Sequence, residues 1–314
     1  TELLECTQRW PGRFEAWTTI NPLDPDKLDK FKQCVARGAQ GLKLYTGHGY
    51  ITKKGEYIFH PIAMDDPSML PLYAYCQENF LPVCIHVNPD KTKTGFAEEF
   101  VSVLEQFPDL KIVAPHFILS SKMSNRLCEL LDTFPNLYSD VSFGDYFMKE
   151  RLEYISEQPA KFKRLFNDYQ DRFMFGTDLV LTEGYNKTEK WIRDQFSAYL
   201  DMLSKDTYTT DAIPGETLNG VNLPGGILEK ILFKNYREMI AHFTVRRDGR
   251  VIAVMEPTKR SFAAREMGTT EAALYSNGAS QLYVSLGDPT PDGAIAVRIY
   301  HKPLVLLIWI GAVV

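Results

Sequence analysis

Short apolar runs that alternate with longer amphipathic stretches constrain the fold of this chain more than any other feature. Between positions 14 and 180, six runs rich in β-branched and aromatic residues recur at intervals of roughly 30 residues. This order is typical of parallel strands joined by crossover helices. The predicted strands are 14–20, 41–45, 81–87, 111–117, 137–143 and 172–178, and the predicted helices are 24–37, 68–79, 97–106, 124–133, 147–170, 187–204 and 226–241.

Six such units suit a (β/α) barrel better than a small doubly wound sheet. A closed barrel has eight units and typically about 250 residues, so two units are expected to be absent. We therefore predict an α/β fold, an incomplete TIM-type barrel of about six of eight units, over residues 1–242. Residues 14–20 should form an exposed edge, which is an aggregation liability.

The pattern changes near position 242. Residues 243–255 have the form of a hairpin with Asp248-Gly249 as its turn, and short strands follow without a helix of useful length. We predict a small antiparallel all-β segment over 243–302. Residues 303–314 are apolar but shorter than the ~20 residues that a membrane span needs, so they form a core strand, a core helix or a span cut short.

Composition excludes several classes of protein. With 45% hydrophobic residues the chain is neither disordered nor fibrous, and a net charge of −5 argues against nucleic acid as a partner. Its five scattered cysteines indicate reduced thiols, not a disulfide framework. The sequence contains no glycine-rich dinucleotide loop, P-loop or Gly-x-Ser-x-Gly motif.

Three residues stand at the ends of separate predicted strands: His86, His116 and Asp178. In barrels the carboxyl ends of the strands surround the active site. A lone histidine at such a position is more often structural, but three residues at the same end favour a functional site. Two imidazoles and one carboxylate can bind zinc, or can supply a general base and its partner.

Other residues near these strand ends are weaker candidates. Lys43 is either a cation of the pocket or a solvated or core-lining lysine. His48 and His60 lie in the loop that follows its strand. Asp140 and Ser142 share a face of one strand, but the alternation does not decide whether that face lines the pocket.

Specific runs of sequence connect the first part of the chain to a known family. They include Gly41-Leu-Lys-Leu44, Pro82-Val-Cys-Ile-His86 and Arg172-Phe-Met-Phe-Gly-Thr-Asp178, in the right order and spacing. Residues 41–241 resemble the amidohydrolase-related family, in its aminocarboxymuconate-semialdehyde decarboxylase-like branch. The resemblance implies a metal-dependent hydrolase or decarboxylase for a small carboxylated or carbonyl substrate. It assigns His86 and Asp178 to a divalent metal such as zinc and His116 and Asp178 to catalysis, and we add Lys43 and His48 as substrate-binding residues.

The chain departs from that family at the metal site. The family's first strand carries a His-x-His pair, whereas this chain has none, and residues 14–20 resemble the family's third strand. Two protein ligands would remain, below the three usual for catalytic zinc. We therefore predict weak or absent metal binding and a crippled enzyme, and leave open a metal-free acid–base mechanism.

The last part of the chain resembles a different protein. The matching runs are 247–249, 256–260, 269–273, 282–289 and 292–303. They are similar to the C-terminal periplasmic part of the CcmF/CycK-type cytochrome c maturation haem lyase subunit. This resemblance implies a truncated transmembrane helix over 303–314 with membrane contact, and a structural role for His301 in preference to haem ligation.

The two resemblances imply different compartments, cytoplasmic for the barrel and periplasmic and membrane-anchored for the segment after it. The leading hypothesis is an enzyme acting on a small-molecule substrate. The alternatives are a component of cytochrome c maturation and an inactive hybrid of two gene fragments. The sequence leaves the substrate and the oligomeric state open.

Overall fold

The computed structural model describes residues 2–10, 14–45, 49–51, 57–59, 62–87, 96–118, 124–145, 147–180, 187–240, 243–247, 250–255, 257–262, 267–276, 280–289 and 295–303. They belong to two compact units, Thr1–Tyr236 (unit 1) and Arg237–Val314 (unit 2). The boundaries 1–242, 243–302 and 303–314 stay a prediction.

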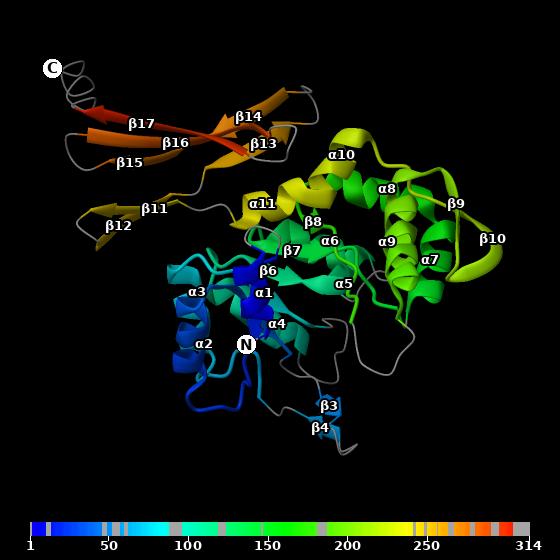
Figure 1. The fold of residues 1–314 in the computed structure, drawn as a ribbon, viewed down its shortest axis with the longest axis horizontal. Coiled ribbons are helices and arrows are strands. Elements are labelled where there is room, and N and C mark those ends of the chain that lie inside the picture. Colours follow the sequence, from blue (N-terminus) through cyan, green and yellow to red (C-terminus); the bar gives the residue numbers. More distant parts are fainter. Residues whose placement is uncertain are drawn as a thin grey trace. The chain divides into compact units, whose positions relative to one another are not determined.

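Unit 1 is built on one six-stranded parallel sheet (Figure 1). Along the sheet the order is β1-β2-β5-β6-β7-β8, so that β1 and β8 lie at its two edges. The α/β fold of an incomplete TIM-type barrel is thereby confirmed. The strands are β1 (Ala16–Thr19), β2 (Ala39–Leu44), β5 (Val83–Ile85), β6 (Ile112–Ala114), β7 (Leu137–Asp140) and β8 (Phe173–Met174).

Helices follow the strands in the predicted order. The predicted helix over 147–170 is divided at Pro159, because proline disfavours a helical conformation at the preceding residue, Gln158. The helices are α1 (Glu2–Arg9), α2 (Lys27–Ala36), α3 (Leu70–Glu78), α4 (Phe96–Gln106), α6 (Ser124–Thr133), α7 (Met148–Glu157), α8 (Pro159–Asp168), α9 (Glu189–Ser204), α10 (Gly225–Glu229), the π-helix Lys230–Lys234 and α11 (Asn235–Ile240). Two small hairpins complete the described part, β3 (Gly49–Ile51) with β4 (Tyr57–Phe59) and β9 (Thr207–Thr210) with β10 (Ile213–Asn219).

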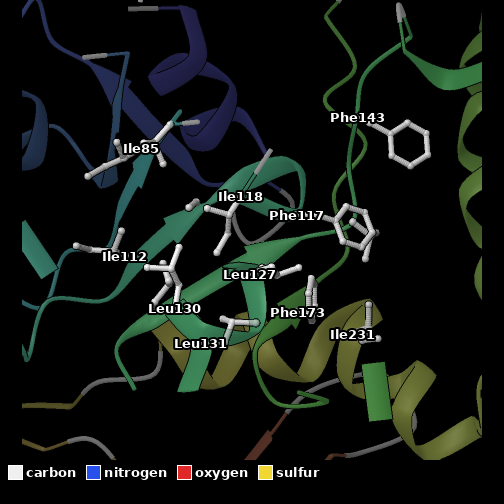
Figure 2. Packing of buried hydrophobic residues seen from close by; sticks show 14 of the residues in the cluster. Ile85, Ile112, Phe117, Ile118, Leu127, Leu130, Leu131, Phe143, Phe173 and Ile231 are labelled. Atoms are coloured by element: carbon white, nitrogen blue, oxygen red, sulfur yellow. The ribbon is translucent and has the colours of Figure 1, made fainter. Parts of the chain in front are cut away.

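Alternate side chains of the parallel strands enter the main hydrophobic core. Leu42 and Leu44 of β2 and Ile85 of β5 are fully buried there, together with the apolar faces of the helices. Aromatic rings fill one region of the core, where Phe117 lies 5.6 Å from Phe173 between ring centroids (Figure 2). Helices therefore cover one face of the sheet, and the intervening strand residues belong to the other face.

A helical segment near the end of unit 1 binds both edges of the sheet. At β8, the amide of Asn235 donates to the carbonyl oxygens of Gln170 (2.7 Å) and Phe173 (2.6 Å). At β1, the hydroxyl of Tyr236 donates to the Glu15 carboxylate and accepts from the Trp17 indole N–H (3.3 Å). These neighbouring residues link the two edge strands without a closed ring of strands.

Unit 2 is antiparallel throughout its described part. The predicted hairpin is confirmed as β11 (Phe243–Arg247) with β12 (Arg250–Met255), although its turn residues lie outside the described ones. The sequence pattern predicted neither β13 (Thr258–Phe262) nor its partner strand β14 (Met267–Glu271). A three-stranded sheet follows, β15 (Ala273–Ser276), β16 (Ser280–Pro289) and β17 (Ile295–Pro303).

The predicted membrane helix falls almost wholly outside the described residues. Pro303 ends strand β17, and 304–314 are not described. Within the described ranges, no helix is both long and apolar enough to cross a membrane.

Candidate active site

A row of side chains crosses the sheet on the face opposite the helices. Lys43 of β2 is in register with Cys84 of β5, which pairs with Val113 of β6 and, through it, Tyr138 of β7. Because side chains alternate along a strand, these residues share one face. Asp140, two residues beyond Tyr138, lies on the same face toward the carboxyl end.

His116 lies just beyond β6 in an unusual backbone conformation. The predicted strand over 111–117 ends early, at Ala114, because the chain enters a left-handed turn. The φ angles of His116, Phe117 and Ile118 are 63°, 55° and 57°. Such angles cost roughly 1–2 kcal/mol per non-glycine residue. The complete burial of the Phe117 and Ile118 side chains, within the core of Figure 2, offsets that cost.

Asp140 connects the turn to the neighbouring strand. Its Oδ1 accepts hydrogen bonds from the backbone N–H of His116 (2.8 Å), the backbone N–H of Ser142 (3.0 Å) and the Ser142 hydroxyl (2.7 Å). A Cβ on Gly176 would lie only 2.7 Å from Asp140 Oδ2, so glycine leaves room for this carboxylate. Asp140 is thus held in place by the sheet and by the turn.

The imidazole of His116 lies between a serine and a carboxylate. Its Nδ1 is 2.8 Å from the hydroxyl oxygen of Ser142 and 3.3 Å from the carbonyl oxygen of that residue. On the other side, Nε2 is 3.8 Å from Asp178 Oδ2. That distance is too long for a direct hydrogen bond, so the two atoms face each other across a gap.

Asp178 also has a left-handed backbone, with φ of 52°. A Cβ on Gly144, whose own φ is 67°, would lie 3.1 Å from Asp178 Oδ2, so a small residue keeps that side clear. Burial raises the pKa of the Asp178 carboxyl, although His116 and Lys43 act in the opposite direction. Asp178 therefore holds a proton more readily than an exposed aspartate does.

His86 contributes a second imidazole to the same place. Its ring packs edge-on against that of His116, with centroids 5.1 Å apart, and is stacked with the Tyr45 ring at 5.4 Å. Its backbone N–H donates to the carbonyl oxygen of Leu44, which continues the pairing of β5 with β2. The strand ends thus bring His86 and His116 together.

Lys43 of β2 is a cation that interacts electrostatically with this group, through Asp178 and Asp140. Its ammonium donates to the Cys84 sulfur (3.2 Å) and lies 4.8 Å from the centre of the Tyr45 ring. Burial by itself lowers the pKa of Lys43, but Cys84, Tyr45 and Asp140 raise it, and the net shift is upward. Burial also raises the pKa of the Cys84 thiol, although the Lys43 ammonium acts in the opposite direction.

The structure thus places His86, His116 and Asp178 beside one another, with Lys43 on the same face. His48 and His60 lie outside the described residues. The roles assigned to these side chains from the sequence stay predictions. Sequence reasoning missed Tyr199, which accepts from the backbone N–H of Phe143 (2.9 Å) and donates to the Thr177 carbonyl oxygen (3.3 Å), and no local pattern pointed to it.

The donor set does not fit a catalytic metal. Among the described residues, no group of three or more His, Cys, Asp and Glu side chains is arranged to hold a metal ion. His86 and Asp178, the ligands that the family resemblance implies, would supply two, and catalytic zinc usually takes three from the protein. We therefore derive no chemical step through a metal.

Comparison with known proteins assigns the first unit to a protein family. The chain belongs to the amidohydrolase family, whose family model matches residues 1–238. A solved structure of an uncharacterized TIM-barrel protein from Bordetella bronchiseptica is similar, with a TM-score of 0.52 and 19% identity over 76% of this chain and 70% of that one. This likeness supports the fold.

A second family model, the CcmF C-terminal beta-sandwich, matches residues 221–303 and overlaps the first over 221–238. The cytochrome c-type biogenesis protein CycK of Bradyrhizobium diazoefficiens is 70% identical over 79 residues, which are 25% of this chain and 12% of CycK. CycK of Rhizobium meliloti is 54% identical over 80 residues, 26% of this chain and 12% of that protein. Both resemblances predicted from the sequence are confirmed, and the chain spans about an eighth of these relatives' length.

Proposed function

We propose that unit 1 is a hydrolase or decarboxylase of the amidohydrolase type that acts on a small carboxylated or carbonyl substrate. The observation that carries the proposal is the 3.8 Å gap between His116 Nε2 and Asp178 Oδ2 at the carboxyl ends of the strands. A substrate atom at this gap can exchange a proton with the imidazole while the carboxyl group holds another. General acid–base catalysis of this kind contributes about 10²- to 10⁴-fold.

Proton movement by His116 serves either reaction. In decarboxylation, the imidazolium protonates the carbon from which carbon dioxide leaves. In hydrolysis, the neutral imidazole takes a proton from the attacking water. In a relative with a complete metal site, a divalent ion such as zinc would polarise the substrate carbonyl. This chain would offer such an ion only His86 and Asp178. We further propose that this chain is less active than such a relative.

We propose Lys43 as the residue that binds the substrate carboxylate. Its pKa is raised, so the ammonium is charged, and it lies on the same face of the sheet as Asp140. Tyr45 lies beside it and offers a flat surface for a planar substrate. His48, in the loop that follows, stays a predicted substrate-binding residue.

A variant series tests the acid–base assignment. The purified full chain is assayed against small aromatic and unsaturated carboxylic acids, with carbon dioxide release and hydrolysis followed separately. We expect His116→Gln to lower kcat at least ~100-fold, while the matched variant His301→Gln, exposed on β17, keeps the wild-type rate. Full activity of folded His116→Gln, or no turnover of any such acid by the wild type, contradicts the proposal.

The role of Lys43 is tested through KM. Lys43→Met should raise KM for carboxylated substrates about 10- to 100-fold, since hydrogen bonds to charged groups contribute ~1.5–3 kcal/mol. Lys32→Met is the matched control, because Lys32 is exposed and also lies over a tyrosine ring, that of Tyr75. An unchanged KM in Lys43→Met removes Lys43 from the binding site.

A second candidate function is cytochrome c-type biogenesis, favoured by the 70% identity of the last part of the chain to CycK. In this case, residues 243–314 act in the periplasm at the membrane. The test is whether a CycK in which the matching 79 residues are replaced by those of this chain restores haem-stained c-type cytochromes in a Bradyrhizobium strain without its own CycK, because the match covers only 12% of CycK. Failure to restore them, with the chain expressed, contradicts this candidate.

A third candidate is an inactive hybrid of two gene fragments, with a cytoplasmic barrel fragment joined to the periplasmic segment. The overlap of the two family models over 221–238 favours it, since the units meet within the same stretch, at Tyr236. Amplification of genomic DNA across the codons for 221–238 should then give no single product. A continuous product from the source genome contradicts the hybrid.

A further inference from the structure

The hydrogen-bond partners around His116 favour one position for its ring proton. The Ser142 hydroxyl has one hydrogen, and it points to Asp140 Oδ1 at 2.7 Å. The hydroxyl oxygen can therefore only accept from His116 Nδ1, which lies 2.8 Å away. The carbonyl oxygen of Ser142, at 3.3 Å from Nδ1, is an acceptor under all conditions.

From these contacts we propose that Asp140 and Ser142 are positioning residues that hold neutral His116 in the tautomer with hydrogen on Nδ1. The lone pair is then on Nε2, the nitrogen that faces Asp178 Oδ2 at 3.8 Å. The inference deepens the proposed function and rests on it for its catalytic meaning: the nitrogen aimed at the gap is the one able to accept a proton.

The same carboxylate holds the backbone that carries the imidazole. Asp140 Oδ1 accepts from the N–H of His116, whose φ of 63° places it in the left-handed turn. Ser142 is 1% exposed, so water does not compete for these hydrogen bonds. Asp140 thus holds the His116 ring in position and, through Ser142, favours the proton on Nδ1 of that ring.

The experiment reads the tautomer directly, without substrate. Imidazole ¹⁵N resonances of the full-length, histidine-labelled chain are recorded above the pH at which the rings are neutral. The His116 signals are assigned by their loss in His116→Gln. In the wild type we expect a protonated Nδ1 and an unprotonated Nε2. A proton on Nε2 overturns the proposal, whatever the variants do.

Variants distinguish the hydrogen bond of the Ser142 hydroxyl from a general effect of packing on the tautomer. Ser142→Ala should shift the tautomer ratio about fivefold toward Nε2–H, because one of the two acceptors at Nδ1 is removed. Ser142→Thr should restore the wild-type ratio, since it keeps the hydroxyl. The matched control is Ser139→Ala, because Ser139 of β7 is buried like Ser142 but its hydroxyl donates to the Ala114 carbonyl oxygen (2.7 Å). An equal shift in Ser139→Ala, or none in Ser142→Ala, overturns the proposal.

Failure of this inference and failure of the proposed function give different results. If the chain turns over no substrate but His116 has the expected tautomer, the positioning stands and the catalytic assignment falls. If turnover depends on His116 but the proton lies on Nε2, the function stands and the role of Asp140 and Ser142 falls. Where turnover is measured, Ser142→Ala should lower kcat with little change in KM.

Discussion

The two units of this chain are both rich in strands, yet they bury the apolar side chains of their strands to different extents. In unit 1, Leu42, Ile112 and Phe173 of the parallel sheet are fully buried. In unit 2, Val297 and Ile299 of β17 are 40% and 62% exposed. Parallel strands require crossover connections, and the helices in them cover the sheet, whereas antiparallel strands join locally and can leave a face open.

The two units also differ in how they place side chains that can take part in catalysis. In unit 1, parallel strands end at the same side, so His86, His116 and Asp178 arrive together from three separate strands. In unit 2, His301 lies exposed within β17, opposite Leu282 of β16. At each side of an antiparallel sheet, amino ends of strands alternate with carboxyl ends. Parallel order is therefore what gathers distant side chains into one candidate site.

The largest expected effect concerns the buried rings of unit 1. Phe173→Ala should lower the free energy of unfolding by about 3–5 kcal/mol, because Phe173 packs against Phe117 and Phe166 in the core. Ile299→Ala in unit 2 should cost less than ~1 kcal/mol, since its side chain is mostly exposed. Urea unfolding of each variant measures both, and equal losses would break the comparison.

The next effect concerns the edge of the parallel sheet. Asn235→Ala should cost about 2–4 kcal/mol, because it leaves the carbonyl oxygens of Gln170 and Phe173 without their amide donor. Asn79→Ala removes a single exposed amide hydrogen bond, to the Tyr75 carbonyl oxygen, and serves as the matched control. Urea midpoints that fall equally in both variants would show that the linkage to β8 does not stabilise unit 1.

A smaller effect is expected at the surface of unit 1. The Lys30 ammonium lowers the pKa of the Asp24 carboxyl below its ordinary value of 3.8. The ion pair therefore stabilises the folded state above pH 3.8. This stabilisation is lost as the pH falls through the lower pKa that Asp24 has in the folded state. Asp24→Asn should therefore be slightly less stable than the wild type at pH 7, with the difference vanishing in acid. Thermal melting from pH 7 to 3 measures this, with exposed Asp29→Asn as control. A stability difference between Asp24→Asn and the wild type that grows as the pH falls would contradict a stabilising Asp24–Lys30 pair.

The smallest expected effect is on metal content. After dialysis the chain should retain far less than one zinc ion per molecule, because His86 and Asp178 supply two of the three ligands usual for catalytic zinc. His86→Ala should then change the zinc content as little as His301→Ala does. Stoichiometric zinc that is lost only in His86→Ala would show that a further ligand completes the site.

Much of the fold was predictable because it depends on local pattern. The spacing of apolar residues placed all six strands of the sheet, and the end of each strand marked His86, His116 and Asp178 as neighbours. The hairpin at Asp248-Gly249 followed from its turn residues in the same way. The hairpins β3–β4 and β9–β10 and the pair β13–β14 were missed. The run Thr258–Phe262 of β13, for example, carries charged residues and little alternation.

What the sequence by itself determined is the order of strands and helices and the end of the sheet at which chemistry is gathered. Only the tertiary structure decided that Asp140 and Ser142 face His116, that the chain turns left-handed after Ala114, and that Asn235 and Tyr236 join the two edges of the sheet. Tyr236 and Glu15 are 221 residues apart in the chain, and no local pattern relates them. The left-handed turn is opposed by local preference. It is held by Asp140 and by the rings that bury Phe117, such as Phe166 and Phe173, and these residues come from other parts of the fold.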